Sequence, residues 1–273
     1  LGIAGAAIGI VIGHIFSIII YLYFLVVQCP ELRINFQGFR IQFKTILYLL
    51  KISALSSVSP ITSIGALILI TAYNVESFIK KVINRIPHNE LKKKIEYSIL
   101  IIDDKSRDKT REEILKLKKE NNFLNINFLF NYKNQGYGGN QKIGYHYAIK
   151  NNFDFVILLH GDGQYAPEKI IDILNAFDNL EADAVQGSRM INKFDALKGK
   201  MPIYKFFGNI GLTSIQNLLT GLKMSEFHSG YRAYKISALK QIPFQLNSNQ
   251  FHFDTEIFLQ LTLAKKKIVE VPI

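Results

Sequence analysis

The chain has 273 residues, of which 48% are hydrophobic, with 33 Lys and Arg against 22 Asp and Glu. Its single cysteine, Cys29, cannot form an internal disulfide or a cysteine metal cage, which excludes a disulfide-stapled secreted domain. Charged residues make up 20% and aromatic residues 12% of the chain, a composition that excludes a disordered protein. A positive mean hydropathy beside a net charge of +11 indicates two parts of unlike composition.

Residues 1–30 contain no Asp, Glu, Lys or Arg. As a helix, residues 1–27 would be about 40 Å long, which exceeds the ~30 Å hydrocarbon core of a bilayer. Gly5, Gly9 and Gly13 recur every four residues, the spacing of small residues at which membrane helices approach closely. A buried soluble helix is the alternative, but such helices average only about 11–12 residues. The pattern predicts a transmembrane helix over 1–27.

The segment that follows is first basic and then apolar. Between residues 28 and 51 a single acid, Glu31, stands against four cations: Arg33, Arg40, Lys44 and Lys51. A basic loop beside a membrane helix favours the cytoplasmic side. We therefore expect a basic loop over 28–43 and a second apolar helix, partly embedded in the membrane, over about 44–60. A second membrane span over 52–72 is the alternative.

Two parts of the chain are expected to differ in function. Residues 1–62 form a predicted membrane segment, and residues 63–273 a separate domain that is truncated at its C-terminus, because the chain ends inside an apolar run. Two short motifs, Gly5-Ala-Ala-Ile-Gly9 and Leu50-Lys-Ile-Ser-Ala-Leu55, resemble polysaccharide and lipid-linked-oligosaccharide flippases of the multidrug-exporter superfamily. This resemblance covers only the first 60 residues or so, too few for a transporter.

From residue 66 onward, short apolar runs alternate with helical patterns. The apolar runs are four to seven residues long and cover 66–72, 97–102, 126–130, 155–159 and 183–186. The helical patterns between them cover 76–85, 107–121, 140–150 and 167–177. Continuously apolar strands separated by helices are typical of a mostly parallel sheet covered on both faces. The predicted fold class is α/β.

Polar residues gather where the predicted strands end. They are Tyr73, Asn74 and Glu76 after the first strand, Asp103 and Asp104 after the second, Gly136 and Gly138 after the third, and His160, Asp162 and Gln164 after the fourth. Ligands of such sheets bind at the carboxyl ends of the strands, so these residues are expected to share one crevice. Capping of the next helix is the alternative for the two neighbouring aspartates.

The chemistry of this crevice suits a nucleotide that carries phosphates. The turn from His160 to Gln164 offers oxygen ligands, which hard cations such as Mg²⁺ or Mn²⁺ prefer. Arg189 and Arg232 could grip phosphate oxygens in fork geometry. No phosphate-cradling G-x-x-x-x-G-K-[ST] loop is present, which favours a nucleotide used as a leaving group. Short lysine runs at 92–94 and 265–267 are interpreted as solvated faces and not as nucleic-acid patches.

In their order, these motifs resemble family-2 glycosyltransferases, most of all the dolichol- and polyprenyl-phosphate mannosyl- and glucosyltransferase branch. Later signatures agree: Gly187-Ser188-Arg189, the run from Ser225 to Arg232, and Phe253-Asp254-Thr255-Glu256. The resemblance covers residues 66–273 and implies a GT-A fold. It also implies a metal-dependent, inverting hexosyltransferase at the cytoplasmic face of the cell membrane, with a nucleoside-diphosphate sugar as donor and a polyprenyl phosphate or cell-envelope glycan as acceptor. The alternative is a flippase fragment with a non-catalytic appended domain.

The resemblance also implies roles for single residues. Donor binding would fall to Tyr73, Asn74, Glu76, Asp104, Gly136, Gly138 and Arg189, and metal binding to His160, Asp162 and Gln164. Acceptor binding would fall to Lys205, Ser229 and Arg232, and catalysis to Asp162, Glu226, Arg232 and Asp254. One departure concerns the metal turn, since the family usually has Asp where this chain has His160. A hydroxyl acceptor would need Glu226 or Asp254 as a base, whereas a phosphate acceptor needs none. Capping of a helix start is the alternative for Asp254 and Glu256.

Residues 203–219 carry apolar side chains at helical spacing. Such a stripe is ordinarily packed against a protein core, which is the default interpretation. The alternative is a helix that lines a groove for a lipid acceptor or lies on the membrane.

Overall fold

The computed structural model describes residues 65–120, 124–192 and 202–273. These residues belong to one compact unit, Thr62–Ile273. The membrane helix predicted over 1–27, the basic loop and the second apolar helix lie outside the described residues. No helix in the described part of the chain is both long and apolar enough to cross a bilayer.

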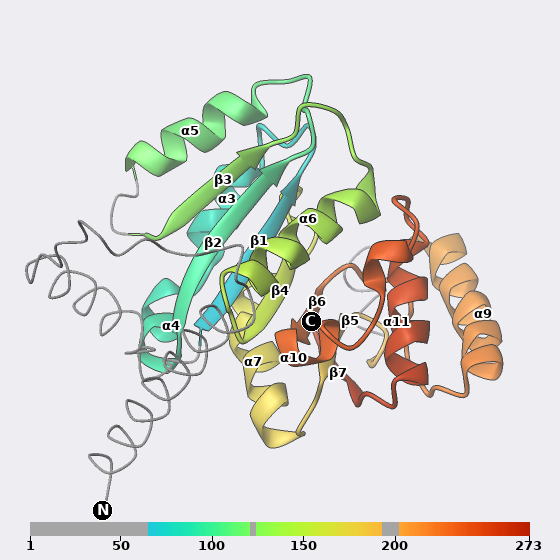
Figure 1. The fold of residues 1–273 in the computed structure, drawn as a ribbon. Helices are drawn as coiled ribbons and strands as arrows, with labels where there is room; N and C mark the ends of the chain where they lie inside the picture. The colour runs from blue at the N-terminus through green and yellow to red at the C-terminus, as the bar shows by residue number, and fades with distance from the viewer. Residues whose placement is uncertain (1–64, 121–123, 193–201) are drawn as a thin grey trace, which may run out of the picture. The chain divides into compact units, whose positions relative to one another are not determined.

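The described domain is built on one seven-stranded sheet of order β3-β2-β1-β4-β6-β5-β7 (Figure 1). The strands are β1 (Gly65–Ala72), β2 (Glu96–Asp103), β3 (Ile126–Phe130), β4 (Phe155–His160), β5 (Ala184–Ser188), β6 (Arg232–Lys235) and β7 (Ile268–Pro272). β1 pairs in parallel with β2 and β4, β2 with β3, and β5 with β7; only β6 runs antiparallel to its neighbours β4 and β5. The prediction of an α/β fold with a mostly parallel sheet is confirmed.

Helices cover both faces of this sheet. One face packs against α3 (Ile79–Arg85), α4 (His88–Lys94), α5 (Thr110–Glu120) and α7 (Ile170–Asn179), the last preceded by a 3-10 turn at Pro167–Lys169. The other face packs against α6 (Tyr137–Lys150), α10 (Ile236–Leu239), the 3-10 turn Phe244–Leu246 and α11 (Phe253–Leu263). Alternate residues of β1 enter the two cores, Ile68 and Ile70 on one side and Leu67 and Leu69 on the other. A strand buried on both faces therefore reads as a continuous apolar run.

One helix, α9 (Ile203–Thr220), is oriented with its polar side toward the domain. Its inward residues bond to neighbouring segments: Asn209 to Glu226, Gln216 to Thr255, and Asn217 to the backbone of Met224. Large apolar side chains on its other side are exposed, namely Ile203, Tyr204, Phe207, Leu212, Ile215, Leu218 and Leu219. The default interpretation of this stripe as core packing is therefore wrong. In Figure 1 the helix lies at the edge of the domain beside α11.

Candidate active site

A cavity of about 320 Å³ opens at the carboxyl ends of β1 and β4, beside the start of α6. It is lined by Thr71, Ala72, Tyr73, Val75, Asp104, Asn134, Gly136, Tyr137, Asn140, His160, Gly161, Asp162, Gln250 and Phe251. Five predicted site residues are thus brought together, one or more from each of the four strand ends: Tyr73, Asp104, Gly136, His160 and Asp162. The structure therefore contains a cavity at the carboxyl ends of the strands, where the sequence predicted a crevice.

The Asp104 carboxylate shapes one wall of the cavity. It is buried, and it accepts hydrogen bonds from the backbone N–H groups of Gln135 (2.7 Å) and Gly136 (3.0 Å) and from Asn131 Nδ2 (2.8 Å). Gly136 has φ +80°, a left-handed backbone that favours glycine. Helix capping by Asp104 is not seen, since α5 begins at Thr110, whose N–H is bonded to Asp108 instead.

Asn74 and Glu76 join two loops and do not line the cavity. Asn74 Oδ1 accepts from Arg107 N (2.8 Å), and Glu76 Oε2 accepts from Lys109 N (2.7 Å). The loop after β1 is thereby tied to the loop after β2. Tyr73 remains 45% exposed at the cavity, so its ring offers a free aromatic face.

The residues at 248–251 form a further wall that the sequence motifs did not reveal. Gly138 N donates to Asn249 O (2.8 Å), and a Cβ at Gly138 would stand 2.5 Å from Ser248 O and 2.6 Å from Phe253 Cβ. The backbone of this segment therefore approaches Gly138 more closely than any residue with a Cβ would allow. Phe251 is 75% exposed, and its ring lies 4.9 Å from the Tyr137 ring. Gly138 therefore serves the wall and does not line the cavity itself.

Behind the cavity, a polar network joins His160, Tyr137 and Asp254. Tyr137 Oη donates to Asp254 Oδ2 (2.8 Å) and lies 3.3 Å from His160 Nε2. Gln141 Nε2 donates to the other carboxylate oxygen of Asp254 (3.3 Å). Burial lowers the pKa of His160, and the charges of Asp162 and Asp254 only partly oppose it. At neutral pH the imidazole is therefore uncharged.

Of the three predicted metal ligands, Asp162 is the best placed to bind a cation, because its carboxylate lines the cavity. Its Oδ1 accepts from Gln164 N (3.0 Å), and the exposed Gln164 side chain is not part of the lining. His160 Nε2 is in contact with the Tyr137 hydroxyl. No group of three or more His, Cys, Asp and Glu side chains with metal-binding geometry occurs among the described residues. One carboxylate together with substrate phosphates is nonetheless a common way to hold Mg²⁺, so Asp162 fits a divalent cation.

Arg232 is placed differently from the prediction. Its side chain is fully buried, and its guanidinium donates to the carbonyl oxygens of Ser229 (2.8 Å), Asp254 (2.5 Å) and Phe227 (2.7 Å). It also stacks on the Phe258 ring, 4.0 Å from the centroid. These contacts occupy the guanidinium in the described structure, which leaves it no free face for an acceptor phosphate.

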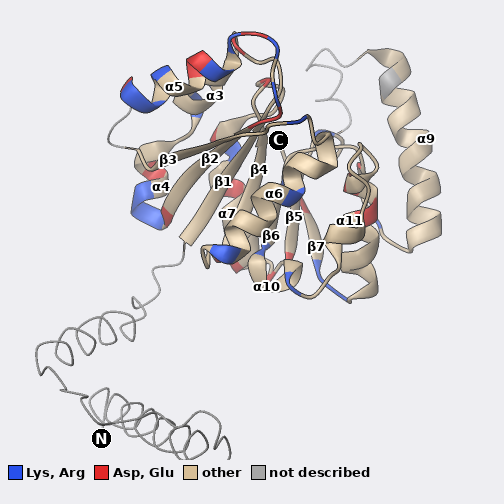
Figure 2. Ribbon diagram, turned by 45° about the horizontal axis from the view of Figure 1, so that its top comes forward, with Lys and Arg blue, Asp and Glu red and all other residues tan. Residues whose placement is uncertain are grey.

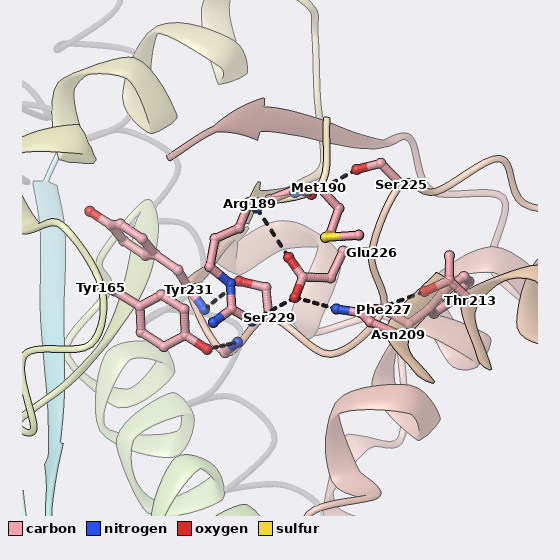
Figure 3. Close-up of polar contacts among 12 residues, drawn as sticks. Tyr165, Arg189, Met190, Asn209, Thr213, Ser225, Glu226, Phe227, Ser229 and Tyr231 are labelled. Atoms are coloured by element: carbon pink, nitrogen blue, oxygen red, sulfur yellow. Dashed lines mark hydrogen bonds and ion pairs between the residues drawn. The ribbon is translucent and has the colours of Figure 1, made fainter. Parts of the chain in front are cut away.

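Arg189 and Ser229 lie apart from the cavity lining. Arg189 is paired with Glu226, as Figure 3 shows, and Ser229 is buried, with its carbonyl oxygen bonded to Arg232. Lys205 belongs to α9, and its side chain lies outside the described part of the structure. The structure thus separates a donor-side cavity from a second polar cluster around Glu226.

Comparison with known proteins gives the family. Residues 67–243 match the model of glycosyl transferase family 2. The chain is 32% identical, over 76% of its length and 83% of the other's, to the UDP-N-acetylglucosamine–dolichyl-phosphate N-acetylglucosaminyltransferase of Methanococcus voltae. It is 26% identical, over 65% and 71% of the two lengths, to the undecaprenyl-phosphate mannosyltransferase of Micrococcus luteus.

Solved structures show the same fold. Glucosyl-3-phosphoglycerate synthase of Mycobacterium tuberculosis, in complex with Mn²⁺, UDP and phosphoglyceric acid, superposes with a TM-score of 0.51 at 14% identity, over 76% of this chain and 68% of that one. This likeness supports the GT-A-type fold that the motifs implied. The family match spans well over half of the chain. The prediction from the ordered motifs is therefore confirmed, and the chain belongs to glycosyl transferase family 2.

Proposed function

We propose that the chain is an inverting hexosyltransferase that moves a sugar from a nucleoside-diphosphate sugar to a polyprenyl phosphate at the cytoplasmic face of the cell membrane. The observation that carries this proposal is the cavity at the strand ends, which joins the Tyr73 ring and the Asp162 carboxylate. The acceptor is inferred from the relatives, whose names specify dolichyl phosphate and undecaprenyl phosphate. In this proposal residues 63–273 are the transferase domain and residues 1–62 the membrane segment.

Basic residues beside the cavity support an anionic donor. A second hollow of about 590 Å³ shares Tyr73 and Asn134 with the first and is lined by Lys105, Arg107 and Lys133. Clustered cations at a cleft raise the local concentration of an anionic ligand and its association rate. We infer that the base stacks on Tyr73 and that the diphosphate lies between this basic rim and Asp162.

The divalent cation is proposed to be Mg²⁺ or Mn²⁺, held by Asp162 together with the donor diphosphate. When bound, it neutralises charge that grows on the leaving diphosphate. His160, which is uncharged and held by Tyr137, adds no negative charge at the position where the family usually has Asp. The proposed metal site of this chain thus depends on a single carboxylate.

The reaction is proposed to be a single displacement. An acceptor phosphate oxygen attacks the anomeric carbon while the bond from that carbon to the diphosphate breaks, which inverts the configuration. A phosphate monoester has its second pKa near ~6, so it is largely ionised at neutral pH and needs no base. The two candidate bases are occupied by protein donors: Glu226 by Arg189 and Asn209, and Asp254 by Tyr137 and Gln141. This occupancy favours a phosphate acceptor over a glycan hydroxyl.

Nucleotide binding tests the proposal against a flippase fragment with a non-catalytic domain. We expect UDP or GDP with Mn²⁺ to raise the melting temperature of the purified chain, because a ligand that binds only the native state stabilises it by mass action. At a concentration of about 100 times Kd, the expected stabilisation is about 2.7 kcal/mol. No shift with any nucleoside diphosphate, with or without the cation, would overturn the proposal.

The outward apolar side of α9 supports contact with the bilayer surface. The helix contains no Asp or Glu, as Figure 2 also shows, so nothing on it repels anionic lipid headgroups. Its polar side is bonded to the domain and its apolar side is exposed, an arrangement that suits a helix lying in the interface plane. The basic loop predicted over 28–43 places the domain on the cytoplasmic side in this proposal.

The contact is testable with residues 63–273 and anionic phospholipid vesicles. Leu218 is 85% exposed, and burying a leucine side chain in the bilayer contributes about 1.5–3 kcal/mol. Leu218→Asp is therefore expected to weaken co-sedimentation by about tenfold or more. Leu246→Asp is the matched control, since Leu246 is 83% exposed but lies outside α9. Equal loss in both variants, or no loss in either, would contradict a bilayer contact through α9.

A further inference from the structure

Glu226 has a buried carboxylate that protein donors surround. Its side chain is 0% exposed and accepts from Arg189 Nη2 (2.6 Å), the backbone N of Arg189 (3.0 Å) and Asn209 Nδ2 (2.9 Å), as Figure 3 shows. Its two carboxylate oxygens are thus occupied by three donors from the protein, which leaves them poorly placed to contact a substrate proton. These contacts indicate that Glu226 orients the side chains of Arg189 and Asn209.

The backbone on which Glu226 sits is itself fixed. Ser225 N and Glu226 N donate to the carboxylate of Glu270 on β7, at 2.7 and 3.3 Å. Gln186 of β5 donates through Nε2 to the Glu226 carbonyl oxygen. The carboxylate therefore projects from a segment tied to two strands of the sheet, which makes it a rigid reference point for whatever it binds.

Arg189 is oriented by this carboxylate but keeps an unpaired donor. Glu226 binds Nη2, while Nε is buried and has no hydrogen-bond partner among the described residues. The Arg189 side chain is 32% exposed, so one part of the guanidinium is held inside and another reaches the surface. A buried N–H without a partner is rare in native proteins, and on a guanidinium it favours the binding of an anion nearby.

Asn209 brings α9 into the same cluster. Its Nδ2 donates to Glu226, and its Oδ1 accepts from Thr213 Oγ1 (3.1 Å) one helical turn further on. Both polar atoms of the Asn209 amide are thus used, Nδ2 toward Glu226 and Oδ1 along the helix. Because the inward side of α9 is polar, such directed bonds, and not apolar packing, decide where the helix sits.

We propose that Glu226 is a positioning residue that fixes both the orientation of the Arg189 side chain and the position of α9. Arg189 was predicted to bind the donor, but it does not line the donor-side cavity, so we assign its guanidinium to the acceptor phosphate instead. Glu226 then holds that guanidinium in one orientation, and a displacement of α9 acts on it through Asn209. The identity of the acceptor rests on the proposed function, whereas the link from α9 through Glu226 to Arg189 does not.

Kinetics of the full chain test the first half. Glu226→Gln keeps the size of the side chain but removes the charge that holds Arg189. We expect KM for polyprenyl phosphate to rise about tenfold or more, as for loss of a hydrogen bond to a charged group, while KM for the donor stays within twofold. Asn209→Ala should raise the acceptor KM in the same direction by a smaller factor. Ser214→Ala on the same helix is the control, because Ser214 is exposed and its hydroxyl bonds, within the described part of the chain, only to Ile210 O of its own helix.

Amide hydrogen exchange tests the second half without any turnover. Glu226→Gln and Asn209→Ala should each speed amide exchange in α9 by about tenfold or more. Exchange in α7 should stay unchanged, because local opening of one helix does not expose the amides of a distant one. Unchanged exchange in α9 in both variants, or equal rises of donor and acceptor KM, would overturn the proposal. If the wild-type chain transfers no sugar to polyprenyl phosphate, the proposed function fails, and exchange in Asn209→Ala alone then decides whether the link exists. Asn209→Ala keeps the Glu226–Arg189 pair, so it remains informative if Glu226→Gln does not fold.

Discussion

Replacing Asp162 with Asn is expected to lower turnover by about 100-fold or more while the fold stays intact. Asp162 lines the cavity and is only half-buried. Its carboxylate accepts a hydrogen bond from Gln164 N, which an amide oxygen can still accept. The substitution removes one negative charge and little else. Loss of charge neutralisation at a leaving diphosphate is a loss of transition-state stabilisation, which lowers kcat.

The measurement is kcat at saturating donor, acceptor and Mn²⁺ or Mg²⁺. Asp172→Asn provides the control, since Asp172 is an exposed carboxylate paired with Lys169 and lies away from the cavity. That variant should turn over at the wild-type rate. Near-normal turnover of Asp162→Asn would mean that this carboxylate holds no cation during the reaction.

Replacing Arg232 with Ala is expected to destabilise the domain by about 3–5 kcal/mol, the cost of removing one partner of a buried charged pair. Arg232 Nη2 lies 3.9 Å from the buried Asp254 carboxylate, and its donors satisfy three carbonyl oxygens. Without the guanidinium, these acceptors remain buried and unpaired. Activity would then fall because the fold fails, and not because an acceptor contact is lost.

Urea unfolding of the purified chain measures this loss. Arg85→Ala is the matched control, because Arg85 also pairs with a carboxylate, that of Glu168 at 2.8 Å, but on the surface. An exposed pair contributes about 1 kcal/mol or less. If Arg232→Ala is as stable as Arg85→Ala but inactive, the predicted role of Arg232 in acceptor binding is restored.

β1, β2 and β4 could be predicted because burial on both faces leaves a continuous apolar run in each of them. β3 is a partly exposed edge strand, but its sequence is still mostly apolar. β6 gave no such signal, since its four residues include Arg232 and Lys235. Arg232 is buried there only because Asp254 and three carbonyl groups, brought from other segments, surround it. Such compensation depends on the tertiary structure and has no local pattern.

The site divides in the same way. Tyr73, Asp104, His160 and Asp162 could be placed together because parallel strands end at one edge of the sheet. Gln250 and Phe251 could not, since they come from a loop more than 80 residues after β4 and reach the cavity by packing on Gly136 and Gly138. The close spacing of those two glycines was the one local sign that another backbone approaches there.

For α9, helical periodicity predicted an apolar side but could not show whether that side faces the protein core or the surface. The polar residues on the opposite side, Asn209, Gln216 and Asn217, turned out to be the ones that attach the helix. Their amide side chains find partners in the loop before β6 and in α11 that no local pattern identifies. Whether a stripe is core or surface therefore depends on the partners offered to the polar side.

The most direct test of the proposed function is transfer from radiolabelled nucleoside-diphosphate sugars to polyprenyl phosphate, with the matching polyprenol as the second acceptor. The two lipids differ only in the phosphate, and a phosphate needs no base whereas a hydroxyl does. We expect labelled lipid from polyprenyl phosphate with at least one donor, and none above background from polyprenol. Transfer to the polyprenol at an equal rate, or no transfer to polyprenyl phosphate with any donor of the panel, would contradict the account.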